Sequence, residues 1–299
     1  MRDWATKLIA ILVIGLALFY GSTHRELTSN VNANQSQKDT NNVLIVGSTA
    51  LQPLAEKAAS LFTEKNPEIS IAVQGGGSGA GLTQIQAGSV QIGNSDVYAE
   101  QKSGIDASKL VNHKVAVVGI APVVNQDVSV DDLTLDQLKN IFTGKYTNWN
   151  QVGGSDLPIV VINRASGSGT RMVFEESVLA DQVAMRAQEQ DSNGTVQKIV
   201  STTPGAISYL GFSYASADGL KKINISSVEP NAENVKTNNW PIWGYEHMYT
   251  LGEPTGATKD FIDFFMSDDV QSQVVEAMGY IRFSDMQFDK DYQGIVTPR

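Results

Sequence analysis

The chain has 299 residues, more than the roughly 100–200 residues of a typical single domain, so its length favours two domains. Hydrophobic residues make up 41% of it and charged residues 18%, a globular composition that excludes a mainly disordered chain. The net charge of −10 excludes the broad basic surface of a nucleic-acid-binding protein and disfavours adsorption to anionic lipid. Any anion that binds must therefore be held by local groups.

The N-terminal residues predict export. Arg2 and Lys7 precede an apolar run from Leu8 to Tyr20, which is shorter than the roughly 18–20 residues of a comfortable membrane span. We expect residues 1–21 to be a signal peptide or an N-terminal membrane anchor, and residues 22–42, rich in Ser, Thr, Asn and Gln, to be a polar linker. Because the chain contains no cysteine, a lipid-modified cysteine is excluded, and the choice between cleavage and anchoring stays open.

Short apolar runs then alternate with amphipathic stretches, which predicts strands and covering helices in a parallel-rich sheet. Expected strands in this part are 43–46, 69–73 and 91–93, and expected helices are 51–65 and a short one at about 82–88. In the first helix, Leu51, Leu54, Ala58, Leu61 and Phe62 recur at helical spacing, so one face of it is expected to be core.

After a long apolar run, Val115 to Val124, a second series of alternating strands and helices is expected. A capping box of Thr134 and Gln137 predicts a helix start. Further expected elements are a strand at 158–162, a helix after residue 170, an extended stretch at 241–251, and helices at about 257–266 and 268–277. We interpret the two long extended stretches as crossings between domains. Domain I would then comprise residues 43–122 and 247–299, and domain II residues 123–246.

Three segments share one design, in which a strand ends in small and hydroxyl residues and a helix follows at once. They are residues 47–50 (GSTA), 75–81 (GGGSGAG) and 164–170 (RASGSGT). Helix N-termini present unpaired N–H groups and about half a positive charge, while glycine allows close approach of the backbone and Ser or Thr adds neutral donors. Each segment alone is consistent with an ordinary capped loop, but three together predict an anion-binding site.

Asp96 and Arg164 are the charged candidates for this site. An ionised Asp accepts a hydrogen bond from a protonated oxyanion such as phosphate, whereas fully ionised sulfate would meet it lone pair to lone pair. An unpaired buried charge costs on the order of 3–5 kcal/mol, or about a hundredfold to several thousandfold in affinity. Arg supplies a planar fork suited to two oxyanion oxygens.

Two nucleotide motifs need to be weighed against this interpretation. Gly75, Gly77 and Ala80 fit a G-x-G-x-x-A fingerprint, with Asp96 about 20 residues on. The helix that follows is barely two turns long, and an exported chain has little access to nicotinamide cofactors, so we expect no cofactor. The pair Gly144-Lys145 lacks the upstream glycine and the following Ser or Thr of a P-loop.

From about Asn42 onward the chain resembles the substrate-binding proteins of phosphate ABC transporters, which are two-lobed periplasmic binding proteins. The similar segments, in the family's order, are VGSTALQPLAE, VQGGGSGAGLTQIQAG, QIGNSDVY, LTLDQLKNIFTGKYTNWNQVGG, INRASGSGTRMVFE and TTPGAISYLGF. The resemblance implies an α/β fold of the type II periplasmic-binding-protein class, in which each lobe is a mixed sheet flanked by helices and two crossover strands form the hinge. It also implies hinged closure over the ligand.

The resemblance further assigns the site residues. Those implied to bind phosphate are Thr49, Ala50, Ser78, Asp96, Arg164, Ser168, Gly169 and Thr170. The implied partners are inorganic phosphate and the permease subunits of an ABC transporter in the membrane, with the protein extracytoplasmic, in the periplasm or at the cell surface; we also expect a monomer. This sequence departs from the family at Asn94, where small residues are common, and in lacking the lipidation cysteine that many cell-surface members carry.

Two other functions remain as alternatives. An exported phosphatase could use Asp96 or Ser78 as its nucleophile, but a hydroxyl nucleophile needs a positioned base, and no histidine lies within the clusters. No Cys/His or carboxylate cluster has metal-ligand spacing, so we expect neither an enzyme nor a metal site. The other alternative keeps the fold and changes the ligand or the role, to another oxyanion or to a sensor or adhesin. Asp96 argues against fully ionised anions.

Overall fold

The structure, a computed structural model, describes residues 41–299. Residues Val43–Arg299 form one compact unit. The predicted signal peptide or anchor and nearly all of the polar linker lie outside the described residues. Within the described part of the chain, none of the helices combines the length and the apolar character needed to cross a membrane.

The first part of the chain forms the alternating strands and helices that its pattern predicts. Its elements are β1 (Asn42–Gly47), α2 (Gln52–Lys65), β2 (Ser70–Gln74), α3 (Ser78–Gln86) and β3 (Ile92–Ser95). Helix α3 begins earlier than predicted, at Ser78, because Gly77 adopts a φ of 83° and turns the chain from the glycine loop directly into the helix.

The second part contains the predicted strands and helices and several short elements that the pattern did not predict. Its main elements are β4 (Leu110–Asn125), α4 (Leu135–Phe142), β6 (Val160–Arg164), α5 (Gly169–Phe174), β7 (Gln188–Gln190), α6 (Asn193–Thr202) and β8 (Ala206–Gly211). Smaller ones are β5 (Asp132–Leu133), β9 (Leu220–Lys222), β10 (Asn224–Ile225) and α7 (Ala232–Lys236). The capping box is confirmed, since Thr134 Oγ1 accepts from Gln137 N and Gln137 Oε1 accepts from Thr134 N.

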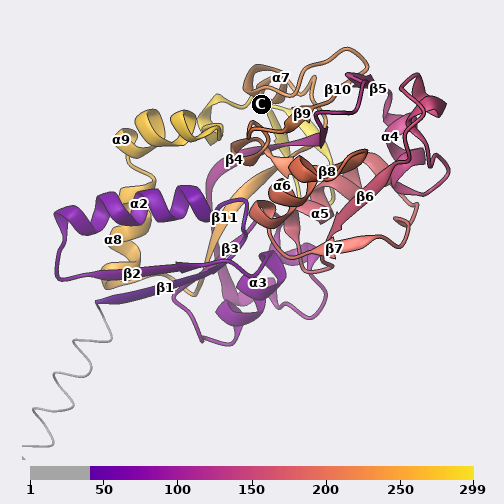
Figure 1. The fold of residues 1–299 in the computed structure, drawn as a ribbon. Helices are drawn as coiled ribbons and strands as arrows, with labels where there is room; N and C mark the ends of the chain where they lie inside the picture. The colour runs from indigo at the N-terminus through magenta and orange to yellow at the C-terminus, as the bar shows by residue number, and fades with distance from the viewer. Residues whose placement is uncertain (1–40) are drawn as a thin grey trace, which may run out of the picture. The chain divides into compact units, whose positions relative to one another are not determined.

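One mixed sheet runs through this unit in the order β2-β1-β3-β11-β4-β8-β6-β7, with β9 beside β4 (Figure 1). Strands β1 and β3 are parallel to each other, as are β6 and β8, and β6 and β7. The long strands β4 and β11 (Trp243–Leu251) lie between these parallel groups and pair with each other antiparallel. Both predicted crossing stretches are thus strands, and they occupy the middle of the sheet.

The C-terminal part adds helices beside α2 and then a hairpin. Helix α8 (Gly256–Phe265) matches its prediction, but the predicted helix at 268–277 is a short α9 (Asp268–Val270) followed by a π-helical turn and a 3₁₀ turn that ends at Gly279 in a left-handed conformation. Strands β12 (Phe288–Lys290) and β13 (Val296–Pro298) pair antiparallel. The sequence pattern did not predict this hairpin.

Separate apolar cores lie on the two sides of the sheet's centre. One core joins β1, α2 and α8, where Phe62 and Phe261 meet edge to face at 5.6 Å between ring centroids. Another joins β4, α4, α5 and β8, where Phe174 and Tyr209 stack at 3.9 Å. Figure 1 shows the same grouping, with α2 and α8 beside β1 and β2, and α5 and α6 beside β6 and β8. The carboxyl ends of β1, β3 and β6 are thereby available to one shared site.

Candidate oxyanion-binding site

Four helix starts meet between the two parallel groups of strands. Thr49 precedes α2, Ser78 begins α3, Thr170 lies in the first turn of α5, and Asn193 begins α6, and each of these side chains is at most 5% exposed. The N-terminal segments of α2 and α3 thus lie close to those of α5 and α6, since Asn193 Nδ2 contacts Thr49 Oγ1 and Gly79 N donates to Gly167 O. N–H groups and neutral hydroxyls are concentrated here, and such groups at helix starts favour an anion.

Asp96 follows directly after β3 and connects the two sides. Its Oδ2 accepts a hydrogen bond of 2.8 Å from Thr170 Oγ1, and its backbone N–H donates to Ser78 Oγ at 2.9 Å. The side chain is 2% exposed, and Oδ1 has no hydrogen-bond partner among the described residues. Oδ2 is thus held by a hydrogen bond within the protein, while Oδ1 remains able to accept hydrogen bonds.

Arg164 ends β6 and is buried, with 1% exposure. Its Nη2 donates to Thr49 Oγ1 at 3.1 Å and to the carbonyl of Asp191 at 3.0 Å, while Nη1 has no partner within the described residues. Burial lowers the pKa of Arg164 and the charge of Asp96 opposes this, but a guanidinium remains protonated at any physiological pH. A buried cation with a free N–H group is stabilised by a bound anion.

The two glycine-rich loops touch each other. Gly79 N donates to Gly167 O at 3.0 Å, and a Cβ on Gly77 would lie 2.9 Å from the same carbonyl oxygen. A Cβ on Gly169 would lie 2.9 Å from Asp96 Cβ and closer still to Ser78 Oγ. Glycine is therefore required at positions 77 and 169 for the two sides to approach this closely.

The remaining predicted residues lie at the same place but already make local hydrogen bonds. Ala50 N donates to Ser48 Oγ at 3.0 Å, so that amide has a partner in this structure. Ser168 is the N-cap of α5, where its Oγ accepts from Arg171 N at 3.2 Å, which leaves the hydroxyl hydrogen able to donate elsewhere. All eight predicted residues are thus brought together, though whether each one binds a ligand remains a prediction.

Asn193 is a residue that the sequence reasoning missed. It is fully buried, and its Nδ2 lies 3.0 Å from Thr49 Oγ1 and 3.4 Å from Thr170 Oγ1. Its backbone N–H also points to Thr49 Oγ1, at 3.3 Å. The available signal was the segment Ser192-Asn193-Gly194-Thr195, a fourth junction of small polar residues before a helix, with Ser192 as its cap.

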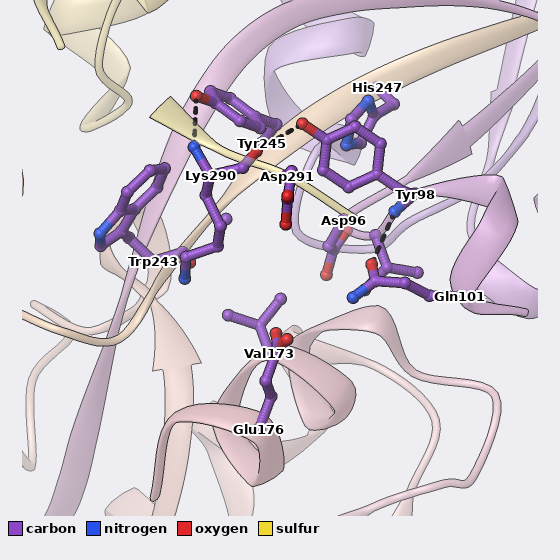
Figure 2. Close-up of a pocket in the computed structure, with 12 residues that line it drawn as sticks. Asp96, Tyr98, Gln101, Val173, Glu176, Trp243, Tyr245, His247, Lys290 and Asp291 are labelled. Carbon is purple, nitrogen blue, oxygen red and sulfur yellow. Dashed lines mark hydrogen bonds between the residues drawn. The ribbon is translucent and has the colours of Figure 1, made fainter. Parts of the chain in front are cut away.

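A small pocket lies beside Asp96, under the C-terminal hairpin (Figure 2). Tyr98 Oη donates to Lys290 O at 2.6 Å, and Lys290 N donates to Tyr245 Oη at 3.3 Å, so these bonds hold β12 against the segment after β3 and against β11. Of the predicted site residues, only Asp96 lines this pocket. This pocket is therefore separate from the junction of helix starts described above.

His247 also borders this pocket and has a packing role. Its ring stacks against Tyr249 at 5.5 Å and tilts against Tyr98 at 4.6 Å, and Nδ1 lies 2.8 Å from Asn112 Oδ1. Complete burial, with a smaller contribution from the charge of Lys114, lowers the pKa of His247 to about 3. The imidazole is therefore neutral at physiological pH.

Comparison with known proteins places the chain in a family. A family model described as PBP superfamily domain matches residues 32–269. The phosphate-binding protein PstS of Bacillus subtilis (strain 168) is 45% identical over 293 residues, which cover 96% of this chain and 98% of the relative. PstS of Staphylococcus haemolyticus is 25% identical and covers 94% of this chain and 93% of the relative.

Solved structures give the same result. One from Clostridium perfringens, described as a phosphate ABC transporter substrate-binding protein with bound phosphate, is 35% identical with a TM-score of 0.76 and covers 81% of this chain and 99% of that chain. An ABC-type phosphate transport receptor from Vibrio cholerae is 28% identical with a TM-score of 0.65, covering 80% and 99%. The predicted α/β, two-lobed binding-protein fold is confirmed. The chain belongs to the PBP superfamily and, within it, to the family of the phosphate-binding proteins PstS.

Proposed function

We propose that this protein binds inorganic phosphate outside the cytoplasm and delivers it to the permease of an ABC transporter. The observation that carries the proposal is the meeting of Asp96 and Arg164 at a buried junction of helix starts, with an unpartnered acceptor on Asp96 and an unpartnered donor on Arg164 among the described residues. A phosphate that still carries a proton needs both groups. The relatives support this ligand, since they are named phosphate-binding proteins.

The proposed binding residues are those assigned from the sequence, together with Asn193. They are Thr49, Ala50, Ser78, Asp96, Arg164, Ser168, Gly169, Thr170 and Asn193. The hydroxyls and amides provide neutral donors, Arg164 donates to phosphate oxygens from Nη1, and Asp96 accepts the phosphate O–H. Because sulfate has no proton at neutral pH, it would leave Asp96 facing an anion without a hydrogen bond, and selectivity follows from that repulsion.

We further propose that the two lobes are residues 43–122 with 247–299, and residues 123–246. The apolar core that joins β1 and α2 to α8 supports the return of the chain to the first lobe. Thr49 and Asp96 of one lobe already contact Arg164, Thr170 and Asn193 of the other. Closure over a ligand would bury it here away from water, where each polar contact is stronger. The protein would act as a monomer at the membrane surface.

Equilibrium dialysis with inorganic phosphate at neutral pH tests this function. We expect saturable binding of one phosphate per chain, with little change in affinity between low and physiological salt, because the donors are local and buried while the overall charge is negative. Absence of saturable phosphate binding would contradict the proposal. A parallel assay measures hydrolysis of a generic phosphate ester, and activity that Ser78→Ala abolishes would instead support an enzyme.

A further inference from the structure

Glu246 is a buried carboxyl group that the proposed phosphate contacts do not use. It lies on β11 between Tyr245 and His247 and is completely inaccessible to solvent. Both of its carboxyl oxygens lack a hydrogen-bond donor among the described residues. A buried carboxylate without a donor or a cation is costly, so the position needs an explanation.

The partner of Glu246 is Asp96. In the antiparallel pairing of β11 with β3, His247 lies opposite Ser95 and Met248 opposite Asn94. Continuing this register by one residue places Glu246 opposite Asp96. Side chains of directly opposite residues lie on the same face of a sheet, so the two carboxyl groups are neighbours. The charge of Asp96 acts on the Glu246 carboxyl group, as this placement requires. The two strands remain close beyond this point, since a Cβ on Gly244 would lie 3.1 Å from Asp96 O.

Two adjacent buried carboxyl groups cannot both be ionised at low cost, so the pair retains one proton. Asp96 already accepts from Thr170, and the Arg164 cation stabilises its charge. The other titratable groups that interact with Glu246 are Tyr280, after η7 (Glu276–Met278), and Tyr214, on η5 (Phe212–Tyr214), and both are neutral acids. Burial, followed by the charge of Asp96, raises the pKa of Glu246 well above its ordinary value.

We propose that Glu246 is a neutral carboxylic acid that donates its proton in a hydrogen bond to Asp96, and thereby acts as a positioning residue that keeps Asp96 ionised and aimed at the phosphate O–H. The Glu246 proton gives a partner to Asp96 Oδ1, which otherwise lacks a donor in the described part of the chain, and the second lone pair of Oδ1 remains to accept the phosphate O–H. It also limits the binding site to a single negative charge, so an anion meets one carboxylate rather than two. The effect on phosphate binding rests on the proposed function, whereas the protonation state of Glu246 does not depend on it.

Glu246→Gln is the decisive variant, because Gln keeps the shape and a donor but has no charge to lose. We expect the full chain carrying E246Q to bind inorganic phosphate at neutral pH within about threefold of the wild-type affinity. Glu246→Leu removes the donor and leaves the Asp96 charge less stabilised, so phosphate affinity should fall by about tenfold or more. Glu253→Gln, an exposed carboxyl group far along the chain from β3, controls for loss of one charge.

The outcomes separate clearly. An E246Q affinity about tenfold tighter would mean that Glu246 is ionised and repels the anion, and one about tenfold weaker would mean that its role is not donation; either result overturns the proposal. Equal affinities of E246Q and E246L would also overturn it. If E246L does not fold, E246Q and the infrared spectrum remain as tests.

Infrared spectroscopy reads the proton directly and needs no ligand. At neutral pH the wild-type protein should show the carbonyl stretch of one buried protonated carboxylic acid, and this band should be absent in E246Q and present in Glu253→Gln. A wild-type spectrum without the band overturns the proposal. Because this measurement does not involve phosphate, failure of phosphate binding in the wild type with the band present would refute the proposed function alone.

Discussion

Thr170 Oγ1 donates a 2.8 Å hydrogen bond to Asp96 Oδ2, which joins the first turn of α5 to the end of β3 across the meeting point of the two lobes. The bond occupies one oxygen of the carboxylate and leaves Oδ1 without a partner among the described residues. A hydroxyl can donate only once, so Thr170 cannot at the same time donate to an anion unless this bond is exchanged. Asp96 is therefore held by α5 through one oxygen, and the other oxygen is the one that we propose selects the ligand.

Asp96→Asn tests the selective role of this carboxylate. The amide can donate to sulfate as well as accept from phosphate, so the phosphate affinity should fall by about 10- to 100-fold while the affinity for sulfate rises. Calorimetric titration with each anion measures both changes. Asp218→Asn, at an exposed position, should leave both affinities unchanged. Unaltered selectivity in D96N would refute the role of the carboxylate.

Two glycines in one loop offer a matched test of closure. A Cβ on Gly169 would collide with Ser78 Oγ and lie 2.9 Å from Asp96 Cβ, whereas a Cβ on Gly167 would meet nothing within 4 Å. Overpacking of this kind costs about 1–3 kcal/mol, so Gly169→Ala should weaken phosphate binding about tenfold or more. Gly167→Ala should bind like the wild type. Equal affinities in the two variants would show that the lobes do not need this close approach.

Asn193→Ala tests the residue that the sequence reasoning missed. The substitution removes the donor that contacts Thr49 Oγ1 and Thr170 Oγ1, so both hydroxyls lose an orienting partner. We expect about a tenfold loss of phosphate affinity, in line with a buried hydrogen bond near charged groups. Asn150→Ala, on the surface, provides the comparison. Calorimetry that finds N193A equal to the wild type would exclude Asn193 from the site.

The buried imidazole of His247 should make the stability of the protein depend on pH. Its pKa is about 3 in the folded protein, below the ordinary value of about 6.5 in the unfolded chain. The unfolded chain therefore binds the extra proton between these values, and the stability that neutral His247 provides is complete above about pH 6.5 and is lost as the pH falls toward 3. Denaturant unfolding at a series of pH values measures the loss.

His247→Gln should remove this component. Relative to the variant, the wild type should lose on the order of 3 kcal/mol of unfolding free energy by about pH 4. The difference between the two proteins isolates His247 from carboxyl groups that titrate in both. Parallel pH profiles would contradict the burial of a neutral imidazole.

The sequence predicted which residues would lie together because they lie at strand ends, where topology determines their neighbours; that they bind phosphate stays a prediction. Ser78 and Asp96 follow strands that pattern alone identifies and Arg164 ends another, and parallel strands place their carboxyl ends at one edge. Asn193 escaped notice because the preceding strand β7 spans only Gln188–Gln190 and has no apolar pattern. Its place in the site depends on the pairing of β7 with β6, a long-range contact that local sequence patterns do not reveal.

Other features depend on packing that periodicity does not encode. The expected helix at 268–277 contains a π-helical turn, Gln271–Val275, where Gln271 Nε2 donates to the carbonyls of Val115 and Phe265, so tertiary bonds replace regular helix geometry. The β12–β13 hairpin is fixed by Tyr98 and Tyr245, far away in sequence. Glu246 was visible as a lone acid within an aromatic strand, but only the register of β11 against β3 gives it Asp96 as a partner.

We propose that this site admits an oxyanion because the anion still carries a proton. Calorimetric titration of the wild-type protein with inorganic phosphate and, separately, with sulfate at neutral pH tests it most directly. Phosphate should bind with one ion per chain and sulfate at least about a hundredfold more weakly. Equal affinities for the two anions, or tighter binding of sulfate, would contradict the account.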